Sequence, residues 1–126
     1  MTIEAANEMA TEATNMGIIG TFTLTNKGGF FCNGGASISI GNGKWKDYGY
    51  TDSLSDGDTQ TYDLSQYGVP DGSVVYLYVN VKAGYNKRAS KECFTFQIGN
   101  VMTAEYKIYG VTANPNLTYN GLASQQ

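Results

Sequence analysis

The longest stretch with few strand-breaking residues runs from Val74 to Ala83, and its apolar and polar side chains alternate. One face carries branched apolar residues only: Val75, Leu77, Val79 and Val81. The other face carries mostly polar and aromatic residues: Val74, Tyr76, Tyr78, Asn80 and Lys82. A period of two is the pattern of a strand that buries one face and leaves the other half in water. We therefore predict a central strand here.

Shorter alternating segments lie before and after this strand, and turn signals separate them. The segments are Ile18–Thr25, Phe30–Ile40, Lys44–Thr51, Thr59–Leu64, Phe94–Ile98, Thr103–Tyr109 and Leu117–Tyr119. Gly41-Asn42-Gly43 is a hairpin signal, and Val69-Pro70-Asp71-Gly72 is a turn, because glycine accepts positive φ values and proline fixes φ. Seven or eight strands at such intervals are typical of an antiparallel sandwich or barrel. Because most inward faces are one-sided, we predict an all-β sandwich of immunoglobulin-like or jelly-roll-like type.

The amino-terminal segment has the one helical pattern. Ala5, Met9, Ala13 and Met16 recur at spacings of three and four, and Gly17 ends the pattern. We expect residues 1–17 to form a short helix or arm, packed on the sheet edge, docked on another subunit or inserted in a membrane. Residues 18–120 would be a single sandwich domain, and residues 121–126 a loose tail.

Composition narrows the functional classes. The chain has 126 residues, of which only 15% are charged, and its net charge is −3. Such a chain lacks the basic surface that binds a phosphate backbone, so we expect no nucleic-acid partner. Histidine is absent, which excludes Ser-His-Asp and Cys-His sites within the chain. We predict that the protein is not an enzyme and needs no cofactor.

The segment Met1–Ala6 lacks the basic and apolar regions of a secretory signal. No run approaches the ~20 apolar residues of a membrane span. The sequence therefore predicts a cytoplasmic protein or one exported by another route.

The spacing of Cys32, Trp45 and Cys93 resembles the Cys-Trp-Cys pattern of immunoglobulin domains. Lys91 stands where that family has a tyrosine, and Cys93 has the opposite parity to the apolar face that includes Phe94. Membership therefore does not follow. A Cys32–Cys93 disulfide is one alternative, and two reduced, separately packed thiols are the other and the favoured one.

The acidic loop with Asp52, Asp56 and Asp58 is a weak candidate for Ca²⁺, because carboxylate oxygens are the ligands that Ca²⁺ prefers. Its spacing does not follow the Asp-x-Asp-x-Asp-Gly pattern of a calcium loop. A solvated turn explains it more simply, so we predict no metal site.

Aromatic residues occur where alternation places them outside the core. We interpret them, with two loop residues, as a ligand-binding face: Trp45, Tyr48, Tyr50, Tyr76, Tyr78, Asn86 and Lys87. Rings stack on the apolar face of a sugar or lie at a lipid headgroup, and amides supply directed hydrogen bonds. The tyrosines could equally be cross-strand pairs that only stabilise the sheet.

Three functional hypotheses follow. The first is a lectin-like module that binds carbohydrate or a glycolipid headgroup. The second is a self-assembling structural subunit of a fibre, crystal or sheath, which would use residues 1–17 and the tyrosine-rich face to bind its copies. The third is a small membrane-active toxin. A homo-oligomer is expected in the second case.

Overall fold

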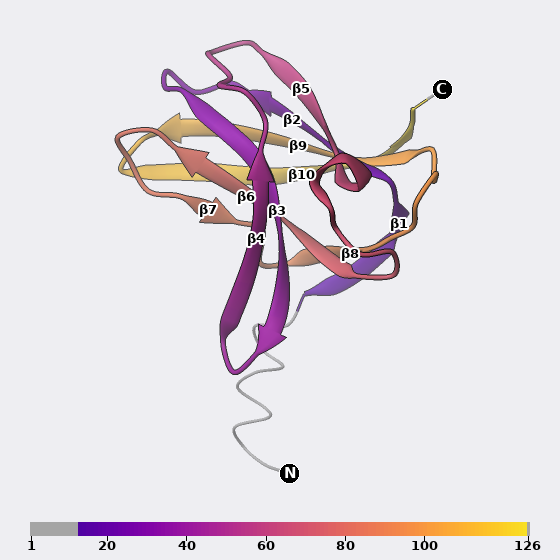
Figure 1. The fold of residues 1–126 in the computed structure, drawn as a ribbon. Coiled ribbons are helices and arrows are strands. Elements are labelled where there is room, and N and C mark those ends of the chain that lie inside the picture. Colours follow the sequence, from indigo (N-terminus) through magenta and orange to yellow (C-terminus); the bar gives the residue numbers. More distant parts are fainter. Residues whose placement is uncertain (1–12, 126) are drawn as a thin grey trace.

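Ten strands and one short 3-10 helix make up the computed structural model, which describes residues 13–125 (Figure 1). In chain order they are β1 (Thr14–Ile19), β2 (Thr21–Asn26), β3 (Cys32–Gly41), β4 (Lys44–Tyr50), β5 (Thr59–Asp63), η1 (Leu64–Tyr67), β6 (Val74–Val81), β7 (Lys87–Arg88), β8 (Glu92–Phe96), β9 (Met102–Val111) and β10 (Asn114–Ser124). The predicted all-β class is confirmed. Within residues 13–125, no helix has the length and apolar character needed to cross a membrane.

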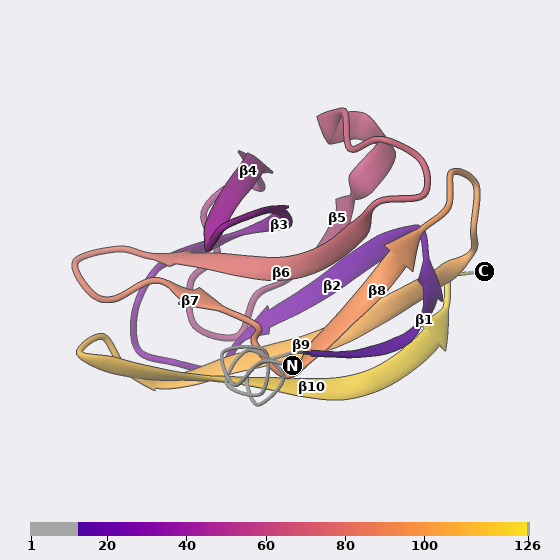
Figure 2. The same ribbon diagram turned by 90° about the horizontal axis from the view of Figure 1, so that it is seen from below.

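The strands form two sheets that lie in two layers (Figure 2). The larger sheet has the order β1-β8-β6-β3-β4, with β7 paired to β6, and the smaller has the order β10-β9-β2-β5. Both sheets are mixed, because β1 pairs in parallel with β8 and β2 pairs in parallel with β9. The predicted wholly antiparallel arrangement of seven or eight strands is therefore wrong. Neither an immunoglobulin nor a jelly-roll type is confirmed.

The predicted central strand is β6. It lies between β8 and β3, and all four of its inward side chains, from Val75 to Val81, are buried. They face a core of aromatic rings in which Phe22, Phe94 and Tyr106 meet edge to face at centroid distances of 5.8 to 6.5 Å. This arrangement is favourable beyond the burial of apolar area. The alternation along β6 therefore identified the buried face correctly.

The amino-terminal helix is not confirmed. Thr14 to Ile19 form β1, which takes in the last residues of the predicted helix, and residues 1–12 lie outside the described part of the chain. The helical spacing of Ala13 and Met16 was misleading because pairing with β8 offers the backbone hydrogen bonds that a short helix would have to make internally.

The carboxyl-terminal strand is longer than predicted. β10 pairs with β9 from Asn114 to Ser124, with a shift of register between Tyr119 and Gly121. The predicted loose tail over residues 121–126 is therefore wrong for residues 121–124. Polar residues such as Asn120 hid this strand, because an edge strand with one exposed face needs few apolar side chains.

Candidate functional site

Four of the predicted binding residues come together on the outer face of the larger sheet. Trp45 and Tyr50 come from β4, and Tyr76 and Tyr78 come from β6. The Trp45 and Tyr76 rings meet edge to face at 4.9 Å, and the Tyr50 and Tyr78 rings lie 6.1 Å apart. β3 lies between these two strands, so the rings reach each other across it. We call these four residues, with Arg88 and Asp47, the aromatic cluster.

Arg88 is the central member of the cluster, and the sequence did not identify it as a site residue. Its guanidinium carbon lies 4.2 Å from the centre of the Trp45 ring and 4.6 Å from that of Tyr78. β7 pairs Arg88 directly with Tyr78, which places the side chain on the outer face. A planar cation between two rings is attracted to both ring faces, and this attraction orients the indole.

Asp47 completes the cluster from β4. Its Oδ1 accepts a hydrogen bond from Arg88 Nη2 at 3.2 Å and another from Ser37 Oγ at 2.6 Å. The side chains of Arg88 and Asp47 are 25% and 39% exposed, so the ion pair can still reach solvent. Burial raises the pKa of Tyr50, with Tyr78 and Asp47 adding to the rise and Arg88 opposing it. The cluster therefore presents neutral rings around one exposed ion pair.

Gly35 makes room for one of the rings. A Cβ atom at this position would lie 2.7 Å from Tyr50 Cδ1 and 3.1 Å from Gly49 O. Only glycine lets the Tyr50 ring lie against the backbone of β3. The paired glycines that the sequence shows inside β3 thus include one with a direct role in the cluster.

The remaining predicted residues have other positions. Tyr48 packs against the hydrophobic core, with Lys46 Nζ 5.3 Å from its ring. Asn86 lies at the border of the cluster, where its Nδ2 donates to Tyr78 OH at 3.0 Å and its Oδ1 accepts from Val81 N at 2.9 Å. Lys87 is not a member of the cluster and lines a neighbouring pocket, which Arg88 borders as well. Of the seven predicted binding residues, four therefore belong to the aromatic cluster, and Tyr48, Asn86 and Lys87 do not.

Cys32 and Cys93 are both free and buried. Burial raises the pKa of Cys32 to about 11. Burial also raises the pKa of Cys93, and a hydrogen bond with Tyr76 opposes part of that rise. Both thiols are therefore protonated at neutral pH and poorly reactive.

The acidic loop forms a turn whose backbone is bonded to Asn26, since Asn26 N donates to Asp58 O at 2.9 Å. Asp58 Oδ2 accepts hydrogen bonds from Ser55 N and Ser55 Oγ, each at 2.8 Å, and these bonds lower the pKa of Asp58. Asp52 and Asp56 are exposed. Across residues 13–125, no three acidic or cysteine side chains come together in a way that could hold a metal ion. The carboxylate of Asp58 thus stabilises the loop.

Arg88 and Asp47 were missed because their roles depend on pairing between distant segments. Alternation places Asp47 and Trp45 on one face of β4, a signal that was available in the sequence. Nothing in the sequence pairs the two-residue strand β7 with β6.

No protein-family model, curated protein or solved structure matches the chain.

Proposed function

We propose that the protein is a non-enzymatic binding module for carbohydrate, either free or as the headgroup of a glycolipid. The observation that carries this proposal is the aromatic cluster, in which rings and one accessible ion pair share the outer face of a sheet. Sugars present apolar C–H faces and hydroxyl edges. Rings bind the first, and charged side chains make strong hydrogen bonds to the second.

The four rings of the aromatic cluster, those of Trp45, Tyr50, Tyr76 and Tyr78, form a ring platform that is ordered without a ligand. Arg88 contacts both the Trp45 and Tyr78 rings, and the Tyr50 ring lies against the backbone at Gly35. Residues that are already ordered lose little conformational entropy on binding. Tyr50 is 37% exposed, so its ring is the part of the platform most open to a ligand.

The test is a glycan array with the full chain, followed by titration of each hit monitored by tryptophan fluorescence. Trp45 is the single tryptophan, so its emission reports directly on the cluster. Tyr50→Ala should weaken binding at least tenfold, which corresponds to ~1.4 kcal/mol. Tyr85→Ala is the matched control, because Tyr85 is 69% exposed on the turn after β6 and outside the cluster.

A blank array would overturn the proposal. So would equal losses in Tyr50→Ala and Tyr85→Ala. Circular dichroism of both variants separates a loss of binding from a loss of fold.

A second candidate function is self-assembly, and one observation favours it. β10 is an edge strand of eleven residues without a single charge. Edge strands of monomeric proteins are commonly protected by charged side chains. In a two-fold pairing of β10 with a second copy, no like charges would meet.

Light scattering and negative-stain images of the full chain test this second candidate. Assembly should disappear in the double variant Asn116→Lys with Asn120→Lys, two exposed positions on β10. Ser53→Lys with Gln66→Lys makes the same change of charge at exposed positions outside the strands and should still assemble. A wild-type chain that stays monomeric at high concentration would exclude this function.

A further inference from the structure

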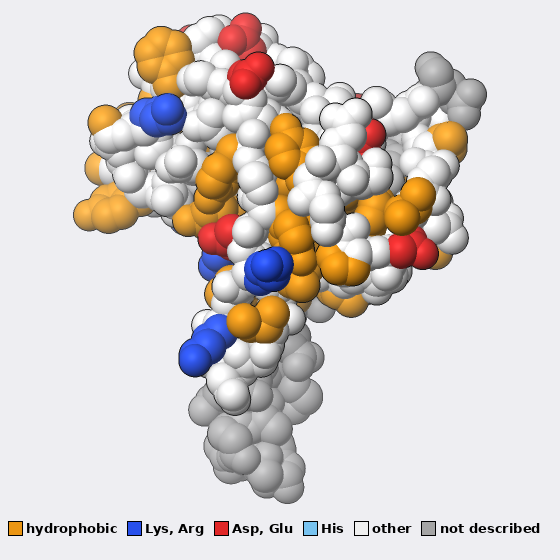
Figure 3. Space-filling view, in the orientation of Figure 1, with side chains coloured by type: hydrophobic (Ala, Val, Ile, Leu, Met, Phe, Trp, Pro, Cys, Tyr) orange, Lys and Arg blue, Asp and Glu red, His pale blue; other side chains and the backbone are white. Residues whose placement is uncertain are grey.

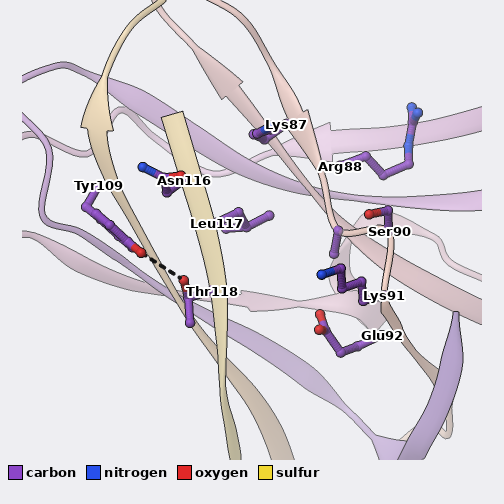
Figure 4. A pocket seen from close by; sticks show the side chains of 10 residues that line it. Lys87, Arg88, Ser90, Lys91, Glu92, Tyr109, Asn116, Leu117 and Thr118 are labelled. Atoms are coloured by element: carbon purple, nitrogen blue, oxygen red, sulfur yellow. Dashed lines mark hydrogen bonds between the residues drawn. The ribbon is translucent and has the colours of Figure 1, made fainter. Parts of the chain in front are cut away.

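A pocket of about 240 Å³ lies between the segment Lys87–Glu92 and the facing parts of β9 and β10 (Figure 4). The segment Lys87–Glu92 forms one wall of the pocket, and it is held in place because the backbone N–H of Ala89 donates to Leu77 O at 2.8 Å. Most of the lining surface is polar. The pocket therefore has walls that are fixed by strand pairing, and it offers hydrogen-bonding groups to a ligand.

The pocket and the aromatic cluster meet at β7, where Arg88 borders both and Lys87 lines the pocket alone. β7 pairs Lys87 with Val79, which faces the core, and Arg88 with Tyr78, which faces outward. Alternation along the strand thus sends the two basic side chains to opposite sides. Figure 4 shows them pointing in different directions.

Two ammonium groups, those of Lys87 and Lys91, line the pocket without forming an ion pair with a described residue. In the described part of the chain, Arg88 and Asp47 form the one ion pair. The side chains of Lys87 and Lys91 make no hydrogen bond to any described residue. With Arg88, the lining carries three basic residues and one acidic residue, Glu92. This excess of positive charge favours a negatively charged ligand.

Glu92 limits which anion fits. Its Oε1 accepts a hydrogen bond from Tyr106 OH at 3.0 Å, and the side chain is only half-buried. In Figure 4 its carboxylate lies beside the Lys91 side chain. A carboxylate repels a bare anion but accepts a hydrogen bond from a hydroxyl group.

The opposite wall supplies neutral polar groups. Thr118 Oγ1 lies 3.5 Å from Tyr109 OH, and Asn116 lies on the same strand as Thr118. Hydroxyl and amide groups of this kind suit a ligand that carries several hydroxyls.

We propose that this pocket binds a hydroxylated carboxylate of monosaccharide size, the chemical class of the uronic acids. The carboxylate lies between Lys87 and Lys91, and ligand hydroxyls face Glu92, Tyr109 and Thr118. A neutral sugar would leave both ammonium groups unpaired, and inorganic phosphate, although its P–OH group can donate to Glu92, is too small to fill a pocket of about 240 Å³. The inference can fail separately from the proposed function, because the pocket shares only Arg88 with the aromatic cluster and every variant used to test it leaves Arg88 unchanged.

The experiment is a titration of the full ¹⁵N-labelled chain with glucuronate, glucose and inorganic phosphate at low salt, monitored by amide chemical shifts. Glucuronate should give saturable shifts confined to residues 87–92, 109 and 116–118. Glucose and phosphate should each bind at least tenfold more weakly, a difference of ~1.4 kcal/mol or more. Phosphate binding as tight as glucuronate binding would overturn the ligand class, and the absence of saturable shifts with glucuronate would overturn the site.

Variants assign the shifts to named side chains. Lys87→Ala with Lys91→Ala should weaken glucuronate binding at least tenfold. The matched control, Lys27→Ala with Lys82→Ala, removes the same charge from two exposed residues outside the pocket and should change affinity less than twofold. Equal losses in both pairs would show that net charge alone is responsible and would overturn the site.

Two further variants separate a loss of binding from a loss of fold and test the role of Glu92. Lys87→Arg with Lys91→Arg keeps both charges and should bind glucuronate within about threefold of the wild type. Glu92→Gln keeps an acceptor for Tyr106 OH but removes the negative charge, so phosphate binding should strengthen severalfold relative to glucuronate binding. An unchanged ratio of the two affinities would show that Glu92 does not set the ligand class.

Discussion

The guanidinium carbon of Arg88 lies 4.2 Å from the centre of the Trp45 ring, although β7 and β4 are far apart in the sequence and not neighbours in the sheet. The same guanidinium donates to Asp47 at 3.2 Å, two residues after Trp45. One basic side chain is therefore held by an indole and a carboxylate of the same strand. This contact turns a set of outward-facing rings into an ordered surface.

Replacement of Arg88 should lower stability and change the surroundings of Trp45. We expect Arg88→Ala to reduce the free energy of unfolding by about 1–2 kcal/mol, and Arg88→Lys by about 1 kcal/mol, because lysine cannot stack as a plane. Urea denaturation measures the loss, and a red shift of tryptophan emission reports greater exposure of the indole. Lys87→Ala is the neighbouring control and should leave the emission unchanged. An unchanged emission in Arg88→Ala would contradict the stacked geometry.

A methyl group at Gly35 should displace Tyr50. The new Cβ atom would lie 2.7 Å from Tyr50 Cδ1 and 3.1 Å from Gly49 O, where the backbone cannot easily yield. We expect Gly35→Ala to lower the free energy of unfolding by about 1–3 kcal/mol. Gly29→Ala meets no atom within 4 Å and should change it by less than about 0.5 kcal/mol. Equal stability of the two variants in urea denaturation would show that β3 does not need a glycine here.

The buried amide of Asn26 should contribute strongly to stability. Its Nδ2 donates to Phe30 O at 2.6 Å and to Leu54 O at 3.0 Å, and its Oδ1 accepts from Gly28 N at 2.8 Å. Asn26→Ala leaves these three buried backbone groups without the amide, which should cost about 2–3 kcal/mol. Asn114→Ala, at an exposed position, is the control for thermal denaturation. A melting temperature equal to that of the control would disprove the role of the amide.

Alkaline pH should destabilise the fold through Cys32. Burial raises the pKa of this thiol to about 11, so from about pH 9 upward the native state keeps a proton that the unfolded state releases. The free energy of unfolding must therefore fall through this window, by up to about 2 kcal/mol. Burial also raises the pKa of Tyr62 and Tyr106, which acts in the same direction at higher pH.

Urea titrations at about pH 8 and about pH 10.5 measure this slope. Cys32→Ala should show a shallower fall, even though removal of the sulfur lowers its stability at neutral pH. An equally steep fall in the variant would assign the pH dependence to the tyrosines instead.

Local patterns in the sequence were sufficient to predict the all-β class and to identify the buried face of β6. Val75, Leu77, Val79 and Val81 could only be buried together, because strand geometry sends alternate side chains to the same side. The hairpin between β3 and β4 was equally visible, since Asn42 and Gly43 both adopt the positive φ values that the turn requires. These features depend on residues that are close in the chain.

The candidate sites depend on residues that are far apart in the chain. Long-range pairing places β7 beside β6, joins β1 to β8 in parallel and extends β10 to Ser124. Alternation tells which side a residue faces, but it carries no information on which strand lies beside it or in which direction that strand runs. For this reason the outward orientation of Trp45 and Tyr78 could be predicted from alternation, whereas the contact of Arg88 with both rings depends on the pairing of β7 with β6.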